Sequence, residues 1–165
     1  MAITTHSLLD TKDLRKLIAK VLTLSPEYVI EANTQVKTDT WENYATVYQM
    51  TSTPNGTSIA FDGDTETEYA ITKYSVVYSI QLVGKNAKLM AERSIPVFSM
   101  NSIVNELKKL KIGILQISAV RDSSLAIDAS YEERAQFDLF VSQDTIVKEH
   151  LNAVKSVEFE LNIEQ

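Results

Sequence analysis

The stretch ITKYSVVYSIQLVG, residues 71–84, constrains the fold more than any other part of the chain. Tyr78, Ile80 and Leu82 alternate with Ser79 and Gln81, which is the period of a β-strand with one side buried. A strand of this length needs partner strands for its backbone hydrogen bonds and a second layer over its apolar side. The chain is therefore predicted to fold around a β-sheet.

The end of this stretch superficially resembles a phosphate-binding loop, because a strand is followed by Gly84-Lys85 and a helix-like run. A P-loop has the pattern G-x-x-x-x-G-K-[ST], and its extra glycines let backbone N–H groups surround the phosphates. Here Gly84 is the only glycine between Gly63 and Gly113, and Asn86 stands where serine or threonine is required. We interpret Gly84 as a tight structural turn and expect Asn86 to cap the following helix.

Three helices are predicted from apolar spacing and from their end signals. The first runs from an N-cap at Asp10 to about Thr23, and Ser25-Pro26 ends it. The second covers 86–95 and ends or kinks at Pro96, and the third covers 102–113. Gly113 stands where a C-terminal cap glycine of that third helix is expected.

The remaining apolar runs predict strands, joined by polar segments. Residues 34–42 and 121–130 are expected to be polar links, and 144–155 is compatible with a helix or with two short strands. Pro54-Asn55-Gly56 predicts a turn, and 51–70 is expected to be an extended loop or hairpin arm. The predicted strands are 27–33, 44–50, 71–83, 114–120, 131–141 and 156–164.

The order of helix, strands, helices and strands indicates an α/β fold of the α+β type. Short turns between strands favour a mostly antiparallel or mixed sheet, with two to three helices packed on one face. A chain of 165 residues fits a single domain, 1–165.

Composition excludes several classes of protein. The chain has no cysteine and therefore no disulfide framework or thiolate chemistry, which suits synthesis in a reducing cytoplasm. It lacks an 18-residue apolar run, and its first residues do not read as a secretory signal, so no membrane association is expected. The net charge of −6 argues against binding nucleic acid by neutralising phosphates.

Residue motifs do not indicate catalysis, a cofactor or a metal. The two histidines, His6 and His150, are not part of a metal-binding or catalytic motif. The acidic run 62–68 resembles the start of a calcium loop, but its sixth position is Thr67 and its twelfth is Lys73, where glycine and glutamate are needed. We interpret this run as a solvated acidic face made of Asp62, Asp64, Glu66 and Glu68.

The C-terminal run SVEFELNIE predicts an edge strand suited to assembly. Its alternating apolar side chains are expected to lie against the core or a neighbouring subunit. They are Val157, Phe159, Leu161 and Ile163.

Several segments follow one another in a characteristic order and spacing. They are an N-terminal amphipathic helix, VIEAN, ENYATVYQM, YSIQLVGKNAKLMAERS, KKLKIGI and VRDSSLAIDASYEERAQFDLFV. From about residue 10 to about residue 163, this order resembles the tail-terminator, or neck-terminator, proteins of tailed bacteriophages, although no single motif carries the resemblance. One departure is that TQVKTDTWE, before the YATV strand, lacks proline, whereas this loop is often proline-rich in that family. The resemblance makes the carboxylates of 62–68 candidates for a subunit interface or for the lining of a channel.

The resemblance implies a virion protein, made in the host cytoplasm, that assembles as a homohexameric ring. Such a ring would cap the tail tube protein, contact a neck or head-connector protein, and adjoin the sheath if the tail is contractile. Genome DNA would pass through without specific binding, and negative charge in the channel suits that passage because it repels phosphates.

Three alternatives stay open from the residues. One is a head-completion or other neck or tail-completion protein, which a ring diameter matched to a portal would indicate. Another is a solution module that binds calcium or a small ligand, which calorimetry would reveal. An enzyme is the third, and no catalytic set supports it.

Overall fold

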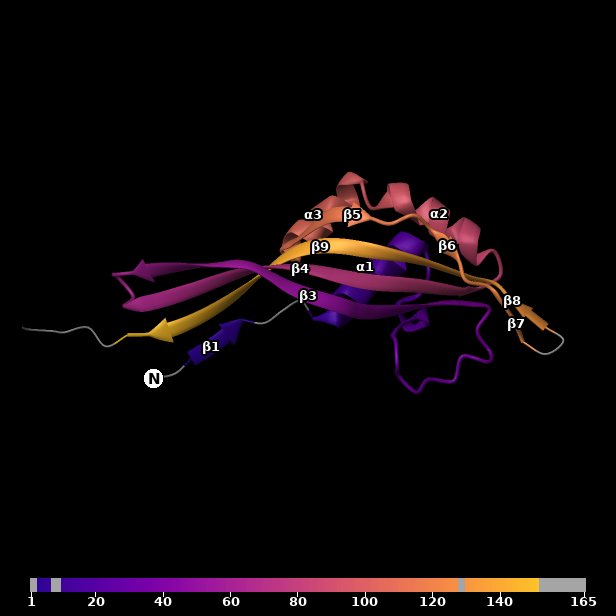
Figure 1. The fold of residues 1–165 in the computed structure, drawn as a ribbon, viewed down its shortest axis with the longest axis horizontal. Coiled ribbons are helices and arrows are strands. Elements are labelled where there is room, and N and C mark those ends of the chain that lie inside the picture. Colours follow the sequence, from indigo (N-terminus) through magenta and orange to yellow (C-terminus); the bar gives the residue numbers. More distant parts are fainter. Residues whose placement is uncertain (1–2, 7–9, 128–129, 152–165) are drawn as a thin grey trace, which may run out of the picture.

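The computed structural model describes residues 3–6, 10–127 and 130–151 as an elongated molecule with a helix-covered body and a long β-arm (Figure 1). The chain runs β1 (Ile3–His6), α1 (Thr11–Leu22), a short 3-10 helix (Pro26–Tyr28), β2 (Val29–Glu31), β3 (Asn43–Asp62) and β4 (Thr67–Gly84). It continues through α2 (Ala87–Val97), α3 (Asn101–Lys109), β5 (Ile112–Ile117), β6 (Arg121–Asp122), β7 (Leu125–Ile127), β8 (Ser130–Glu132) and β9 (Arg134–His150).

Within the described ranges, seven strands form one mixed sheet, in which β1, β9, β4, β3 and β2 follow one another. The long strands β3, β4 and β9 pair antiparallel, and only β2 with β3 is parallel. One edge of β9 is occupied by β4, and its other edge is shared in turn by β6, β5 and β1. The strands β7 and β8 form a separate small hairpin. The predicted class, an α+β fold with a mostly antiparallel sheet, is confirmed.

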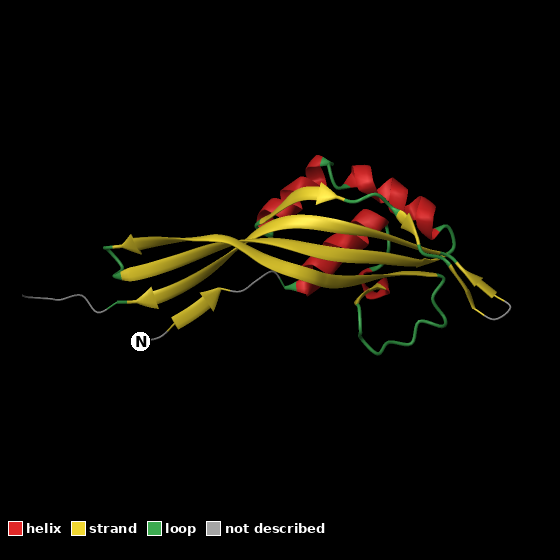
Figure 2. Ribbon diagram, viewed as in Figure 1, coloured by secondary structure: helices red, strands yellow, loops and turns green. Residues whose placement is uncertain are grey.

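The three helices lie on one face of the sheet, as predicted (Figure 2). Strand residues that point to this face are fully buried and form a single apolar cluster with the helices. Burial of each large apolar side chain among them stabilises the fold by about 1.5–3 kcal/mol. The strand residues of the core are Ala45, Val47, Val76, Tyr78, Ile80, Leu82, Ala135, Phe137, Leu139 and Val141.

The first helix follows the sequence prediction closely. Asp10 is its N-cap, and its carboxylate accepts a 2.9 Å hydrogen bond from the backbone N–H of Lys12. Thr23 ends the helix in the left-handed conformation, just before Ser25-Pro26. The apolar stripe that includes Leu14, Leu17 and Ile18 is buried against the sheet and the other helices.

The junction between β4 and α2 is a tight turn at Gly84, which has a φ of 118°. The predicted cap at Asn86 is only half right, because Asn86 occupies the N-cap position but its side chain makes no capping hydrogen bond. Its left-handed backbone, with φ of 59°, turns the chain into the helix instead. Pro96 lies within the last turn of α2, which ends one residue later.

The turn predicted at Pro54-Asn55-Gly56 is wrong. These residues lie inside β3, where the pairing with β4 shifts between Pro54 and Gly56, and a similar shift falls between Gln49 and Thr51. Proline and glycine are tolerated there because a β-bulge at a sheet edge accommodates both. The segment 51–70 therefore forms the outer part of a hairpin whose turn lies at 63–66.

Three other boundaries differ from the sequence prediction. Gly113 lies inside β5 and not at a helix cap, since α3 ends at Lys109 with Leu110 as its C-cap, and Lys111 adopts the left-handed conformation. The segment 121–130 is not a plain link, because it carries β6 and β7 and begins β8. The ambiguous segment from residue 144 continues β9 as far as His150.

The predicted C-terminal strand, 156–164, lies outside the described residues. In the part of the chain that the structure describes, none of the helices is both long enough and apolar enough to cross a membrane.

Candidate assembly surface

The outer halves of β3, β4 and β9 extend beyond the helices as an arm (Figures 1 and 2). We define the arm as residues 51–73 together with 144–150. Its β3 residues are exposed almost without interruption, in contrast to the buried residues of the same strand in the body. The strands β4 and β9 pair continuously from Val83 and Arg134 to Thr67 and His150, so the arm continues the central sheet directly.

The acidic run 62–68 forms the tip of this arm. The Asp62 carboxylate accepts hydrogen bonds from the backbone N–H of Asp64 at 3.0 Å and from the Thr65 hydroxyl at 2.8 Å. The Thr65 hydrogen bond, and then the Asp64 one, lowers the pKa of Asp62 below its ordinary value. Asp62 therefore organises the turn. Among the described residues, no group of side chains is arranged to hold a metal ion.

His150 closes the tip from the β9 side. Its Nδ1 lies 3.1 Å from the backbone oxygen of Glu66 and 3.2 Å from the hydroxyl of Thr67. The backbone N–H of Leu151 also donates to the oxygen of Glu66, at 2.9 Å. These contacts assign His150 a structural role, joining the end of β9 to the turn between β3 and β4.

The arm carries two exposed apolar side chains that the sequence reading missed, Ile59 and Phe61. They are 69% and 60% exposed, respectively. Ile59 pairs with Ala70, and Ala70 pairs with Val147, so this row lies on the face that carries the core further along the sheet. In the sequence, the one signal for this pair was that Ile59 and Phe61 stand two positions apart within a polar run, as two side chains on one face of a strand do. On the arm, this face has no helix over it (Figure 2).

The outer edge of β3 is open along the arm. The strand β2 pairs with β3 only between Ala45 and Val47. Among the described residues, no strand pairs with the outer edge of β3 from 48 to 62. Pro54 and the two register shifts interrupt this edge, as they do at edge strands that avoid uncontrolled pairing.

An apolar groove of about 440 Å³ lies between α3 and β5. Lys108 stands on its rim, and Lys109 and Lys111 follow within three residues, all exposed. Leu115, on β5, is 59% exposed. The apolar side chains that line the groove are Phe98, Val104, Leu107, Ile112, Ile114 and Ile117.

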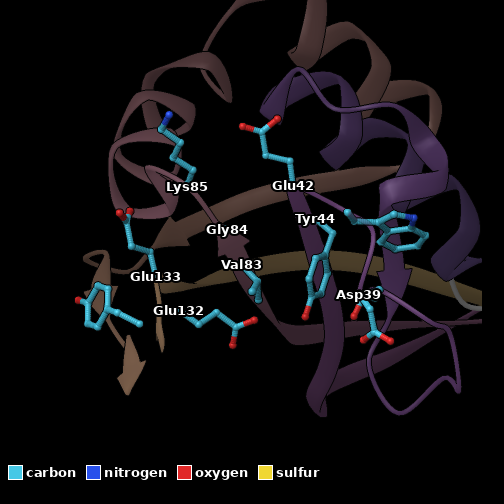
Figure 3. Close-up of a pocket in the computed structure, with 11 residues that line it drawn as sticks. Asp39, Glu42, Tyr44, Val83, Gly84, Lys85, Glu132 and Glu133 are labelled. Atoms are coloured by element: carbon cyan, nitrogen blue, oxygen red, sulfur yellow. The ribbon is translucent and has the colours of Figure 1, made fainter. Parts of the chain in front are cut away.

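A cleft of about 520 Å³ lies beside Gly84 (Figure 3). Lys85 and Glu133 stand on one side of it, and Glu42, Tyr44 and Asp39 on the other. With Glu132, the cleft is lined by four carboxylates and one lysine. This excess of carboxylates makes the cleft unfavourable for a phosphate group.

The open face of the sheet in the body is polar. Gln136 donates a 2.6 Å hydrogen bond from Nε2 to the hydroxyl of Ser79, on the neighbouring strand. Asp138, whose side chain is largely buried, accepts a 2.7 Å hydrogen bond from the Arg121 guanidinium. The ion pair with Arg121 gives one carboxylate oxygen of Asp138 a hydrogen-bond partner at a position that water reaches poorly.

An uncovered apolar arm face, an open strand edge and a lysine-rimmed apolar groove are features of a protein that works by binding other proteins. The chain belongs to a family described as phage neck terminator proteins, whose match covers residues 12–165. It is therefore a structural component of the phage virion, at the neck, and not an enzyme.

A chain in a solved structure titled "Virion of native gene transfer agent (GTA) particle" is similar to this chain at a TM-score of 0.33 and 13% sequence identity. The similarity covers 82% of this chain and 90% of that chain. No curated protein matches the sequence.

The sequence-predicted site residues fall in separate places. The four acidic residues of 62–68 lie at the arm tip, while Gly84 and Gly113 lie in the body, at the end of β4 and inside β5. The C-terminal residues Val157, Phe159, Leu161 and Ile163 lie outside the described residues. Only at the arm tip do several of the predicted residues therefore lie near one another.

Proposed function

We propose that this chain forms a homohexameric ring that caps the phage tail tube and joins the tail to the neck or head connector. The family match over residues 12–165 carries this proposal. The ring binds the tail tube protein on one side and the connector on the other, and in a contractile tail it also adjoins the sheath. Six copies of a modest contact act together on a ring, so each subunit contact needs little affinity of its own.

The charge of the chain supports passage of DNA through such a ring. The formal net charge is −6, and four carboxylates gather at the arm tip within residues 62–68. A channel lined with like charge repels phosphates, and DNA then moves without binding tightly. We propose these arm-tip carboxylates as residues of the channel or of a subunit interface.

Particles made without this protein test the proposal. We expect heads and tails that are not joined, with tails of irregular length, and purified protein added to such an extract should restore joining. Electron cryo-microscopy of complete particles should place the chain at the head–tail junction. Attached tails of uniform length in its absence, or density for the chain elsewhere in the particle, would contradict the proposal.

A further inference from the structure

We propose that the arm of one subunit docks in the α3–β5 groove of a neighbouring copy, with Ile59 and Phe61 as the side chains that enter it. This inference rests on the proposed ring and names the contact that builds it. The arm and the groove are different surfaces of the same chain. A contact between them is heterologous, so each copy gives one arm and accepts one, and a series of such contacts forms a ring when the rotation between copies closes.

The apolar surfaces match in character. Ile59 and Phe61 are mostly exposed on the arm face that continues the core, and nothing in the described part of the subunit covers them. The groove between α3 and β5 is lined mainly by aliphatic and aromatic side chains and holds about 440 Å³. Burying two large apolar side chains favours association, against the cost of ordering the arm.

The charges around these surfaces are complementary. Asp62, Asp64, Glu66 and Glu68 surround the tip next to Phe61, and this run contains no lysine or arginine. Lys108 stands on the rim of the groove, and Lys109 and Lys111 follow it closely in the sequence. Lys148, a basic residue of the arm, lies over the ring of Tyr69 at 5.3 Å. The strand register places Lys148 and Tyr69 on the face of the arm opposite Ile59 and Phe61. Lys148 therefore adds no positive charge to the docking face.

The arm cannot reach the groove of its own subunit. The groove lies beside Gly113, which pairs with Ser142, whereas Ile59 lies in the row of Ala70 and Val147. Five residues of β9 separate these rows, or about 17 Å at about 3.3 Å per residue, and the three strand spacings from β3 to β5 add about 14 Å across the sheet. Because the arm continues the central sheet, this gap closes only if the sheet folds back on itself. The occupant is therefore a second copy.

Cysteine crosslinking tests the contact, because the natural chain contains no cysteine. Phe61→Cys combined with Val104→Cys places one thiol on the arm and one in the groove. Under mild oxidation, or with a short bismaleimide, we expect a ladder of covalent dimers, trimers and higher species up to the ring. The matched control is Ala60→Cys with Val104→Cys, which moves the arm thiol to the opposite face and should lose the ladder. Thermal unfolding of each variant shows that it is folded.

A charge exchange gives a second readout. Asp64→Lys with Glu68→Lys on the arm, or Lys108→Glu with Lys109→Glu at the groove, should each abolish the ladder of the Phe61–Val104 cysteine pair. Combining both sets should restore it, because the complementary pattern returns with reversed sign. Asp62 is left unchanged because its carboxylate organises the arm turn.

The crosslinking is carried out on concentrated purified protein and on purified particles. A ladder in either preparation supports the contact, and its absence from both overturns it. Dimers formed by Phe61→Cys alone would show arm-to-arm contact and also overturn it. If imaging places the chain at the head–tail junction and no ladder forms, this contact fails while the proposed function stands. If a ladder forms and the chain lies elsewhere in the particle, the contact stands while the proposed function fails.

Discussion

Gly84 lies so close to the backbone of Glu42 that a Cβ atom built on Gly84 would stand 2.1 Å from the Glu42 carbonyl oxygen. The same Cβ would also meet the Asn43 side-chain oxygen at 2.5 Å. Together with a φ of 118°, this contact explains why glycine ends β4 where the chain turns into α2.

Alanine substitutions at three glycines separate the two causes of that requirement. Gly84→Ala combines an unfavourable φ with a backbone clash, Gly56→Ala has only the unfavourable φ, and Gly63→Ala has neither. We expect Gly63→Ala to change the free energy of unfolding by less than about 0.5 kcal/mol. Gly56→Ala should lower it by about 1–3 kcal/mol, and Gly84→Ala should lower it further because backbone atoms cannot rotate away. Chemical denaturation measures all three, and equal losses at 56 and 84 would contradict the role of the clash.

Gly113 allows β5 to approach β9 closely. A Cβ at this position would lie 2.7 Å from the Ser142 hydroxyl oxygen. Gly113→Ala should therefore destabilise the protein by about 1 kcal/mol, the low end for overpacking, since a side chain can move aside. Adding Ser142→Ala should recover most of that loss. A double-mutant cycle measures the coupling, and a loss that is unchanged by Ser142→Ala would show that the crowding has another cause.

The pKa of Asp62 reports the order of the arm tip. Because the folded-state pKa is lowered, the contribution of Asp62 to stability is fully present at neutral pH and is lost as the pH falls through that lowered pKa. Thr65→Val removes the largest cause and should raise the pKa toward its ordinary value. Carbon-detected NMR titration of the carboxyl measures this shift. Thr67→Val is the matched control, because that hydroxyl does not bond Asp62, and an equal shift in both variants would refute the assignment.

Much of the body could be predicted from the sequence because local patterns and burial agree there. The stripe of Leu14, Leu17 and Ile18 predicted α1, and the alternation of Phe137, Leu139 and Val141 predicted the buried half of β9. In both, the residues that face the core are the apolar ones, so periodicity alone identified the element. The helix-packed face of the sheet followed from the same patterns.

The arm was less predictable because its β3 residues are exposed on both faces of the sheet. Without a buried side, β3 loses the clean alternation that marks a strand, and Pro54-Asn55-Gly56 then favours a turn locally. Pairing with β4 overrides that preference, since a strand already aligned by its buried half can continue through a bulge.

By itself, the sequence determined which segments are helical, which half of each long strand faces a core, and that Gly84 ends a strand. Those features depend on interactions between residues near one another in the chain and on the period of their apolar side chains. Only the tertiary structure decided that β3 runs unbroken to Asp62 and that Gly113 lies against Ser142. It also decided that Ile59 and Phe61 lie on the face of the sheet that bears the core, at a part of that face which no helix covers. These depend on the register between distant strands, where a shift of one residue exchanges the two faces of the sheet.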